Sequence, residues 1–285
     1  MTPALDKSID IRAMTEEEVD LAIDWAAAEG WNPGFDDAPC FRAEDPDGFL
    51  AAWVDGKPVA SISVIGYGER YGFLGFYIVL PEYRGRGIGY RLWQAGMARM
   101  GNRVVGLDGV PDQQESYKKS GFALAYRNIR YSGEPTIEAP QDPRLRHIDL
   151  AWIDPVVAYD RPFFPAPRER FLRCWLSGET RQAWALVENG QVQGYGVARG
   201  CRDGAKIGPL FANDPASADL LFRQLVSVAG SGPVALDTPE PNPEAITLAR
   251  RYGLSPSFET ARMYKGNAPD LPTDRTFGVT TFELG

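Results

Sequence analysis

The stretch Val79-Leu-Pro-Glu-Tyr-Arg-Gly-Arg-Gly-Ile-Gly89 decides the fold. It follows Tyr71–Leu80, an unbroken aromatic and aliphatic run that is typical of a buried strand. It precedes Tyr90–Met100, whose pattern predicts a helix. Closely spaced glycines let a backbone approach a ligand, and amides at a helix N-terminus attract anions. With Arg84 and Arg86 adding positive charge, the stretch predicts a strand–loop–helix unit that holds a phosphate group.

The spacing of these glycines excludes two common nucleotide sites. It is not the GxGxxG of a dinucleotide-binding fold, and it is not the GxxxxGK[ST] of a nucleotide-hydrolysing loop. A plainer interpretation, a glycine-rich turn with two solvated arginines, stays open at this point.

The order of predicted elements in the first half recurs in the second. Phe211 follows Val79 by 132 residues, and Gly253 follows Gly121 by the same number. This self-similarity predicts two divergent copies of one α/β unit, at residues 1–134 and 146–285, joined by a proline-containing linker. Two unrelated α/β domains with matching spacing are the alternative.

Composition limits the class of protein. The chain has 285 residues, of which 44% are hydrophobic and 24% charged, and its net charge is −8. These values are typical of a globular protein of about two domains. The acidic balance disfavours nucleic acid and mildly favours a cationic partner. No apolar stretch could span a membrane and Met1–Lys7 lacks signal-peptide features, so we expect a cytoplasmic protein without a membrane partner.

Cysteine and histidine are scarce. Cys40, Cys174 and Cys201 are odd in number and far apart, and His147 is the single histidine. This pattern suits a reducing cytoplasm and argues against both a disulfide framework and a zinc site. We therefore expect no metal.

Two motifs resemble those of the GNAT (GCN5-related N-acetyltransferase) superfamily. Arg84, Gly87 and Gly89 match its acyl-CoA signature, and Tyr117 stands four residues before Gly121-Phe122, as in its second signature. The resemblance implies a mixed, mostly antiparallel α/β sheet with a splayed central strand in each domain. It also implies direct transfer of acetyl from acetyl-CoA to an amine. The implied acetyl-CoA contacts are Ile78, Val79, Arg84, Gly85, Arg86, Gly87, Ile88, Gly89 and Tyr90.

Direct transfer requires a neutral amine and benefits from an acid for the leaving thiolate. Tyr117 matches the family position of that acid, although an aromatic residue there could simply pack between helix and sheet. Asp108 is expected at the carboxyl end of a strand beside the splayed gap. It could act as a base or hold a cationic amine, and a plain turn aspartate is the alternative.

The family builds its acceptor pocket after the first helix. Glu29, Trp31, Asp36 and Asp37 lie there and are the predicted acceptor contacts, although each could be an ordinary loop or capping residue. The chain departs from the family pattern at Val110, where an asparagine is common.

The second copy lacks the chemistry of the first. Its loop, Ala212–Ala218, has no arginine or glycine, and Ala249 stands where Tyr117 stands in the first copy. We expect a degenerate domain without its own acetyl-CoA that shapes the acceptor site. The predicted function is an N-acetyltransferase acting on a small primary amine: an amino acid, an amino sugar or a polyamine. The alternative is a non-catalytic acyl-CoA sensor or a partner-binding module.

Overall fold

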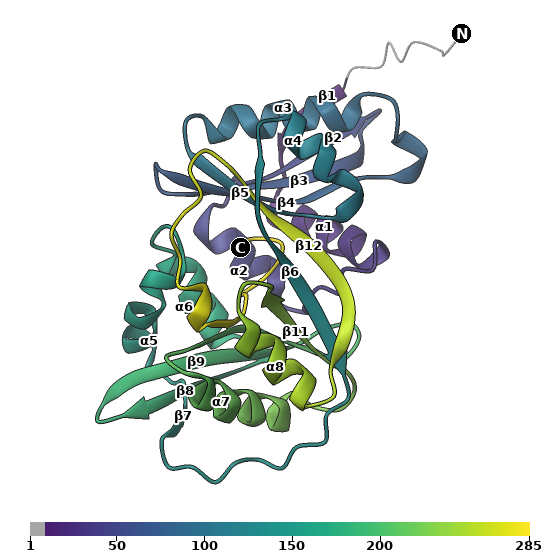
Figure 1. Cartoon of the computed structure of the whole chain (residues 1–285). Coiled ribbons are helices and arrows are strands. Elements are labelled where there is room, and N and C mark those ends of the chain that lie inside the picture. The colour runs from purple at the N-terminus through teal and green to yellow at the C-terminus, as the bar shows by residue number, and fades with distance from the viewer. Residues whose placement is uncertain (1–8) are drawn as a thin grey trace.

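The computed structural model describes residues 9–285; Met1–Ser8, which include the stretch that lacks signal-peptide features, lie outside the described residues. One mixed sheet runs through both halves in the strand order β1-β2-β3-β4-β5-β12-β6-β11-β10-β9-β8-β7, with β13 paired to β10 (Figure 1). The first half contains β1 (Ile9–Ala13), α1 (Glu16–Ala28), α2 (Asp37–Glu44), β2 (Phe49–Val54), β3 (Lys57–Tyr67), β4 (Tyr71–Val79), η1 (Pro81–Tyr83), α3 (Ile88–Met100), β5 (Val104–Gly109), η2 (Pro111–Gln113), α4 (Gln114–Lys119) and β6 (Ala123–Gly133). The second half contains β7 (Leu145–His147), α5 (Ile153–Asp160), η3 (Arg161–Phe163), α6 (Glu169–Ser177), β8 (Arg181–Glu188), β9 (Gln191–Gly200), β10 (Ala205–Ala212), α7 (Pro215–Val228), β11 (Val234–Pro239), α8 (Pro243–Arg251), β12 (Ser255–Lys265), η4 (Thr273–Arg275) and β13 (Thr276–Gly278).

Local sequence signals form the elements they predict. Thr15 caps α1 by accepting from the amide of Glu18, whose carboxylate in turn accepts from the amide of Thr15. Asp55 and Gly56 both have positive φ and join β2 to β3 in a tight hairpin. The predicted mixed α/β architecture is confirmed.

The two copies exchange one strand each, β6 of the first copy and β12 of the second. β12 pairs with β5 on one side, from Ala261↔Gly109 to Lys265↔Val105, and with β6 on the other. β6 in turn pairs with β11, the strand that β12 would join in an unexchanged second copy. Figure 1 shows β6 and β12 side by side, running from one half of the molecule to the other. Side chains of the second copy therefore lie beside the predicted site of the first.

The helices α1, α2, α5 and α6 contribute to one apolar core shared by the two halves. Phe41 of α2 stacks on Trp175 of α6, with 6.0 Å between ring centroids, and both side chains are fully buried. Separate clusters lie under α3 in the first half and under α7 in the second. The shared core means that burial of apolar surface holds the two copies together.

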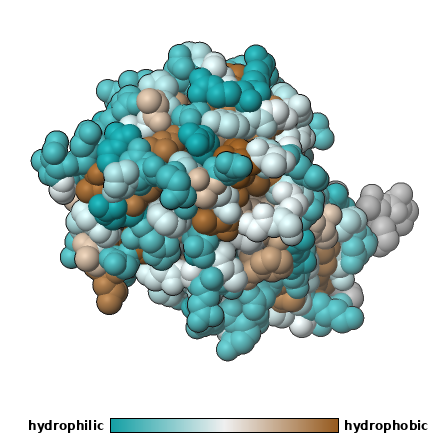
Figure 2. Space-filling view, turned by 90° about the horizontal axis from the view of Figure 1, so that it is seen from below, coloured by the Kyte–Doolittle hydropathy of each residue, from teal (hydrophilic) through white to brown (hydrophobic). Residues whose placement is uncertain are grey.

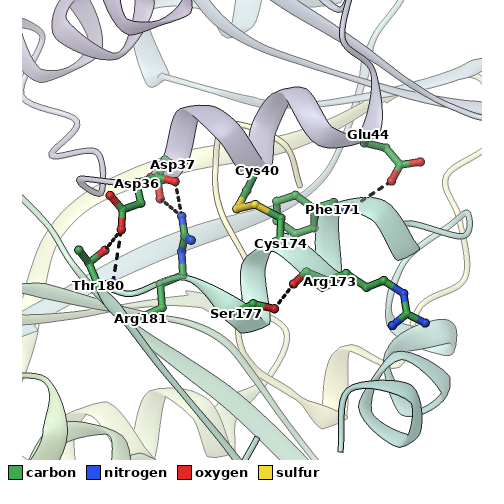
Figure 3. Close-up of a disulfide and its surroundings, with 10 residues drawn as sticks. All are labelled: Asp36, Asp37, Cys40, Glu44, Phe171, Arg173, Cys174, Ser177, Thr180 and Arg181. Carbon is green, nitrogen blue, oxygen red and sulfur yellow. Dashed lines mark hydrogen bonds and ion pairs between the residues drawn. A yellow bond between two sulfur atoms is a disulfide. The ribbon is translucent and has the colours of Figure 1, made fainter. Parts of the chain in front are cut away.

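A disulfide also joins the copies, and the prediction that the cysteines stay unpaired is wrong. Cys40 of α2 and Cys174 of α6 are bonded, although 134 residues separate them in the sequence (Figure 3). Packing of α2 against α6 brings their Cα atoms to 5.3 Å, a distance that a disulfide spans readily. Cys201 is buried and free. Cysteine spacing therefore gives no support for a reducing compartment.

The face of the molecule seen from below is mostly polar. From below, Figure 2 shows hydrophilic residues over much of this face, with apolar residues in small separate patches. Within residues 9–285, no helix is long and apolar enough to cross a membrane.

Candidate active site

A groove opens where the parallel strands β4 and β5 separate. Their pairing runs from Tyr71↔Val104 to Leu74↔Leu107 and stops there. Phe76, two residues further on, has a φ of +46°, and the register of β4 against β3 shifts at this point. The bulge turns β4 away from β5 and leaves its backbone without a strand partner on that side. The predicted splayed central strand is confirmed.

The N-terminus of α3 lies beside this groove. Gly85 and Gly87 have φ values of +74° and +79°, which glycine adopts without strain. Gly87 caps α3 without any side-chain hydrogen bond, so the first amides of the helix remain available to an anion. Gly89 has no room for a side chain, because a Cβ there would lie 2.9 Å from the Tyr77 hydroxyl oxygen. The loop backbone therefore fits a phosphate group.

Most of the predicted acyl-CoA contacts share the groove. Seven of the nine predicted contacts are among the residues that line it: Ile78, Val79, Arg84, Gly85, Gly87, Gly89 and Tyr90. Two predicted contacts do not line it. Arg86 is exposed with its guanidinium 5.3 Å from the centre of the Tyr83 ring, and Ile88 is buried in the core beneath α3.

At the edge of the groove, Glu29 contacts Arg84, which lies in the loop between β4 and α3. Its carboxylate accepts from the Arg84 guanidinium at 2.5 Å, and Nε of Arg84 also donates to the Val79 carbonyl at 2.8 Å. Both partners are partly exposed, so this pair contributes little to stability. The structure places Glu29 as the partner of a loop arginine, at the edge of the groove.

A second cavity adjoins the groove, because Trp31, Tyr77, Val110 and Gln113 line both spaces. Its other walls come from both copies and are largely aromatic. The second copy and β6 contribute Arg130, Phe258, Thr260, Phe282 and Glu283. Trp31 is thus the predicted acceptor contact that the structure places in this cavity.

Tyr117 lies at the wall of this cavity. Its ring packs on Trp93, 5.5 Å between centroids, and on Phe122. Burial raises the pKa of Tyr117 well above that of a free tyrosine, and it raises the pKa of Tyr77 to about 12. Both hydroxyls therefore stay protonated at neutral pH and can donate a proton. Tyr117 thus packs between helix and sheet and also lines the cavity.

Asp108 also lines the cavity, but its oxygens are occupied. Arg262 of β12 donates two hydrogen bonds to the carboxylate at 2.9 and 2.7 Å, and the Asn128 amide donates a third at 2.9 Å. Burial raises the pKa of Asp108, while Arg262 and Asn128 oppose the rise. This arrangement makes Asp108 the partner of a buried guanidinium.

Asp36 and Asp37 lie away from both spaces, at the junction of the copies (Figure 3). Asp36 accepts from the Thr180 hydroxyl at 2.5 Å. Asp37 is fully buried and accepts from Arg199 at 2.9 Å and from the Gly34 amide at 2.8 Å. These two carboxylates hold the first copy to the second, which a sequence pattern cannot distinguish from contact with an acceptor.

Comparison with known proteins identifies the family. Models described as "Acetyltransferase (GNAT) family" and "Acetyltransferase (GNAT) domain" match residues 12–122 and 156–278. The holothin acyltransferase of Pseudoalteromonas sp. (strain SANK 73390) is 34% identical over 94% of this chain and 92% of its own length. The chain belongs to the GNAT family.

Solved structures show the same tandem fold. A protein from Pyrococcus horikoshii, assigned as an acetyltransferase, superposes with a TM-score of 0.80 at 22% identity, over 97% of this chain and 96% of its own. A tandem GNAT protein from the clavulanic acid biosynthesis pathway superposes with a TM-score of 0.62 at 15% identity, over 92% of this chain and 100% of its own.

The second GNAT copy has the same split strand but a filled gap. β10 pairs with β11 only from Ala205 to Ile207, and β13 then pairs with β10 at Leu210 and Phe211. The N-terminus of α7 is also occupied, because the Asp214 carboxylate accepts from the amides of Ala216 and Ser217. Own-chain groups thus fill both parts of the second copy that correspond to the first copy's groove.

The residues that sequence reasoning missed come from β6, β12 and the segment 279–285. Arg130, Phe258, Thr260, Phe282 and Glu283 carry no motif. The exchanged strands β6 and β12 bring the first three to the cavity, and the path of the segment 279–285 brings the other two. Among the residues that the structure describes, no group of three or more His, Cys, Asp or Glu side chains could hold a metal ion.

Proposed function

We propose that this GNAT protein is an acyl-CoA-dependent N-acyltransferase that uses acetyl-CoA and acetylates a small primary amine. One observation carries the proposal. The groove beside the N-terminus of α3, where no side chain bonds to the first amides, adjoins a cavity that Tyr117 lines. A groove that fits a phosphate group and a separate cavity that opens to it suit two substrates that must meet. Acetyl-CoA when bound would supply the acyl group as a thioester.

Groups of the chain itself would bind the cofactor and transfer the proton. The amides at Gly87 and after it, with Arg84, would hold the pyrophosphate, and the edge of β4 at Ile78 and Val79 that no longer pairs with β5 would lie along the extended arm. The Tyr117 hydroxyl, protonated at neutral pH, would give its proton to the departing sulfur. The aromatic side chains of the cavity wall would limit access of water to the reacting atoms.

Two further parts of the proposal rest on other observations. The relative named holothin acyltransferase supports acyl transfer, so holothin belongs in any panel of acceptors for this chain. The net charge of −8 supports a cationic small molecule, with nucleic acid disfavoured. We also propose a cytoplasmic location for an acyl-CoA-dependent enzyme; the Cys40–Cys174 disulfide is an observation that opposes it.

The test is release of free thiol from acetyl-CoA across a panel of primary amines, with wild type and Tyr117→Phe. We expect amine-dependent release by the wild type and a fall of about 10²-fold or more in kcat for Tyr117→Phe, the size of a lost general acid. KM for acetyl-CoA should change little. Acetyl-CoA binding without release for any amine would instead identify a sensor.

A further inference from the structure

Two polar atoms on the second cavity have no hydrogen-bond partner. Glu283 and Thr260 both line it and are 5% and 2% exposed. Glu283 Oε2 and Thr260 Oγ1 are buried, and neither bonds to any group in the described part of the chain. A buried polar atom without a partner costs about 1–3 kcal/mol. Two of them on one cavity point to a ligand that would satisfy both.

The cations near Glu283 are already engaged. Arg130, Arg199 and Lys206 all lie within electrostatic range of its carboxylate. Arg130 donates to Asp237 at 2.7 Å through two nitrogens, and Lys206 donates to the Trp31 carbonyl at 2.8 Å.

Arg199 is likewise engaged, because it donates to Asp37. None of the three cations donates a hydrogen bond to Glu283. An N–H donor on a bound molecule could therefore reach the carboxylate without displacing an existing bond.

Three of the other lining residues present flat aromatic rings. Trp31, Phe258 and Phe282 line the cavity, and the rings of the last two lie 6.3 Å apart. The guanidinium of Arg130 lies 5.6 Å from the centre of the Phe258 ring and 5.0 Å from that of Phe282, which fixes both rings. Such walls favour a planar apolar body over a sugar or an extended polyamine.

The segment that carries Glu283 is held firmly against β4. A Cβ added at Gly75 would lie 2.0 Å from the Glu283 carbonyl oxygen, so only glycine permits this approach. The Tyr67 hydroxyl donates to the neighbouring Leu284 carbonyl at 3.0 Å. The C mark in Figure 1 shows that this segment lies between the two halves. Glu283 therefore occupies a defined position beside the bulge of β4.

We infer that this cavity binds the acceptor, an amine on a flat apolar ring, and that Glu283 is the base that deprotonates it. The inference rests on the proposed function and names the acceptor end of the same site. Thr260 Oγ1 would accept a second N–H of the amine, and Trp31, Phe258 and Phe282 would enclose the ring.

The proton balance is complete. Glu283 Oε2 takes one proton from the ammonium, and the freed electron pair forms the C–N bond as the C–S bond breaks. Tyr117 gives its proton to the sulfur and regains one from the amide nitrogen through solvent. Glu283 then releases its proton to solvent. Ammonium and thioester thus give amide, thiol and one proton.

The test compares Glu283→Gln with the wild type on two acceptors. Benzylamine is protonated at neutral pH, whereas aniline is neutral and needs no base before attack. We expect kcat/KM for benzylamine to fall by about 10²-fold or more and that for aniline to fall much less. Thermal stabilisation by acetyl-CoA should be unchanged. Glu259→Gln, an exposed acid on β12, is the matched control and should retain both activities.

Thr260→Val, which keeps the side-chain size, is the second variant should Glu283→Gln fold poorly. It should raise KM for benzylamine about tenfold with little change in kcat. Full activity of Glu283→Gln, or equal losses on both acceptors, would overturn the base role while leaving the proposed function intact. No thiol release by the wild type with any amine would refute the proposed function and this inference with it.

Discussion

The Asp108 carboxylate on β5 and the Arg262 guanidinium on β12 form a buried ion pair with two hydrogen bonds, at 2.9 and 2.7 Å. Asp108 belongs to the first copy and Arg262 to the second, and 154 residues separate them. The pair lies where the exchanged strand enters the first copy's sheet, at the register Arg262↔Asp108. The pair therefore fixes the exchanged strand β12 to Asp108, which lines the second cavity.

Breaking this pair from one side should be costly. Arg262→Met leaves a carboxylate buried without its cation, and we expect the free energy of unfolding to fall by about 3–5 kcal/mol. The double variant Asp108→Asn with Arg262→Met should recover much of that loss, as measured by urea unfolding. Arg127→Met on β6 removes an exposed pair with Glu240 and should cost under about 1 kcal/mol. Equal costs for the two arginine variants would contradict the buried-pair interpretation.

The disulfide between Cys40 and Cys174 should stabilise the joined copies. Because it closes a long loop of 134 residues, we expect Cys174→Ser to lower the free energy of unfolding by about 2–4 kcal/mol. A reductant should lower the wild type's Tm by several degrees and leave that of Cys174→Ser unchanged. Cys201→Ala is the control, because Cys201 is free, and it should keep the full response to reductant. A wild-type Tm that ignores the reductant would argue against the bond.

Removing the charge of Glu29 should tighten binding of acyl-CoA. Glu29 holds Arg84 and adds negative charge to the groove where a pyrophosphate would lie. Glu29→Gln should therefore lower Kd by roughly three- to tenfold at low salt, with a smaller effect at high salt because exposed charges are screened. Glu16→Gln, a charge change on an exposed side chain of α1, should leave Kd unchanged in the same calorimetric titration. Weaker binding by Glu29→Gln would count against this placement of the pyrophosphate.

The role of the loop Arg84–Gly89 in binding acetyl-CoA can be tested by comparing Gly87 with Gly190, a glycine of similar backbone geometry elsewhere in the chain. Gly87 and Gly190 have φ values of +79° and +77°, and a Cβ at either would meet nothing within 4 Å. Glu substitutions should thus cost similar stability, about 1 kcal/mol from backbone strain. Only Gly87→Glu should abolish the rise in Tm that acetyl-CoA produces. Loss of that rise in both variants, or in neither, would exclude the loop as its origin.

The buried amine of Lys206 should make stability depend on pH. Burial, with repulsion from Arg130, lowers the pKa of Lys206 from 10.5 to about 8. Between these values the unfolded chain binds more protons than the folded one, so the free energy of unfolding should rise with pH. The slope is at most about 1.4 kcal/mol per pH unit. Lys206→Met should lack this contribution in urea titrations from pH 8 to 10.5, and identical slopes for both proteins would refute it.

Local patterns predicted the parts of the site that are local. The strand before Val79, the loop at Gly87 and the position of Tyr117 beside the splayed gap all follow from residues close together in the chain. The loop's role in binding acyl-CoA stays a prediction.

Contacts between the copies could not be predicted in this way. Asp37 meets Arg199 and Cys40 meets Cys174 because α2 docks on the second copy. Glu283 reaches β4 only through the path of the segment 279–285. Such contacts are set by tertiary packing, and a carboxylate that will hold a guanidinium has the same local sequence as one that will hold a substrate amine.

Because β6 and β12 cross between the copies, the single chain has the topology of a domain-swapped dimer whose two subunits are covalently joined. In the exchanged arrangement, residues 1–134 without the second copy would leave β5 paired with β4 alone and β6 with no strand partner. Such open edges invite pairing to another strand. The two copies are thus expected to complete one another's folding. Since Phe258 and Thr260 arrive with β12, the second cavity is complete only after that strand is seated. A chain that is partly synthesised or half unfolded would have the groove of the first copy but not the complete second cavity.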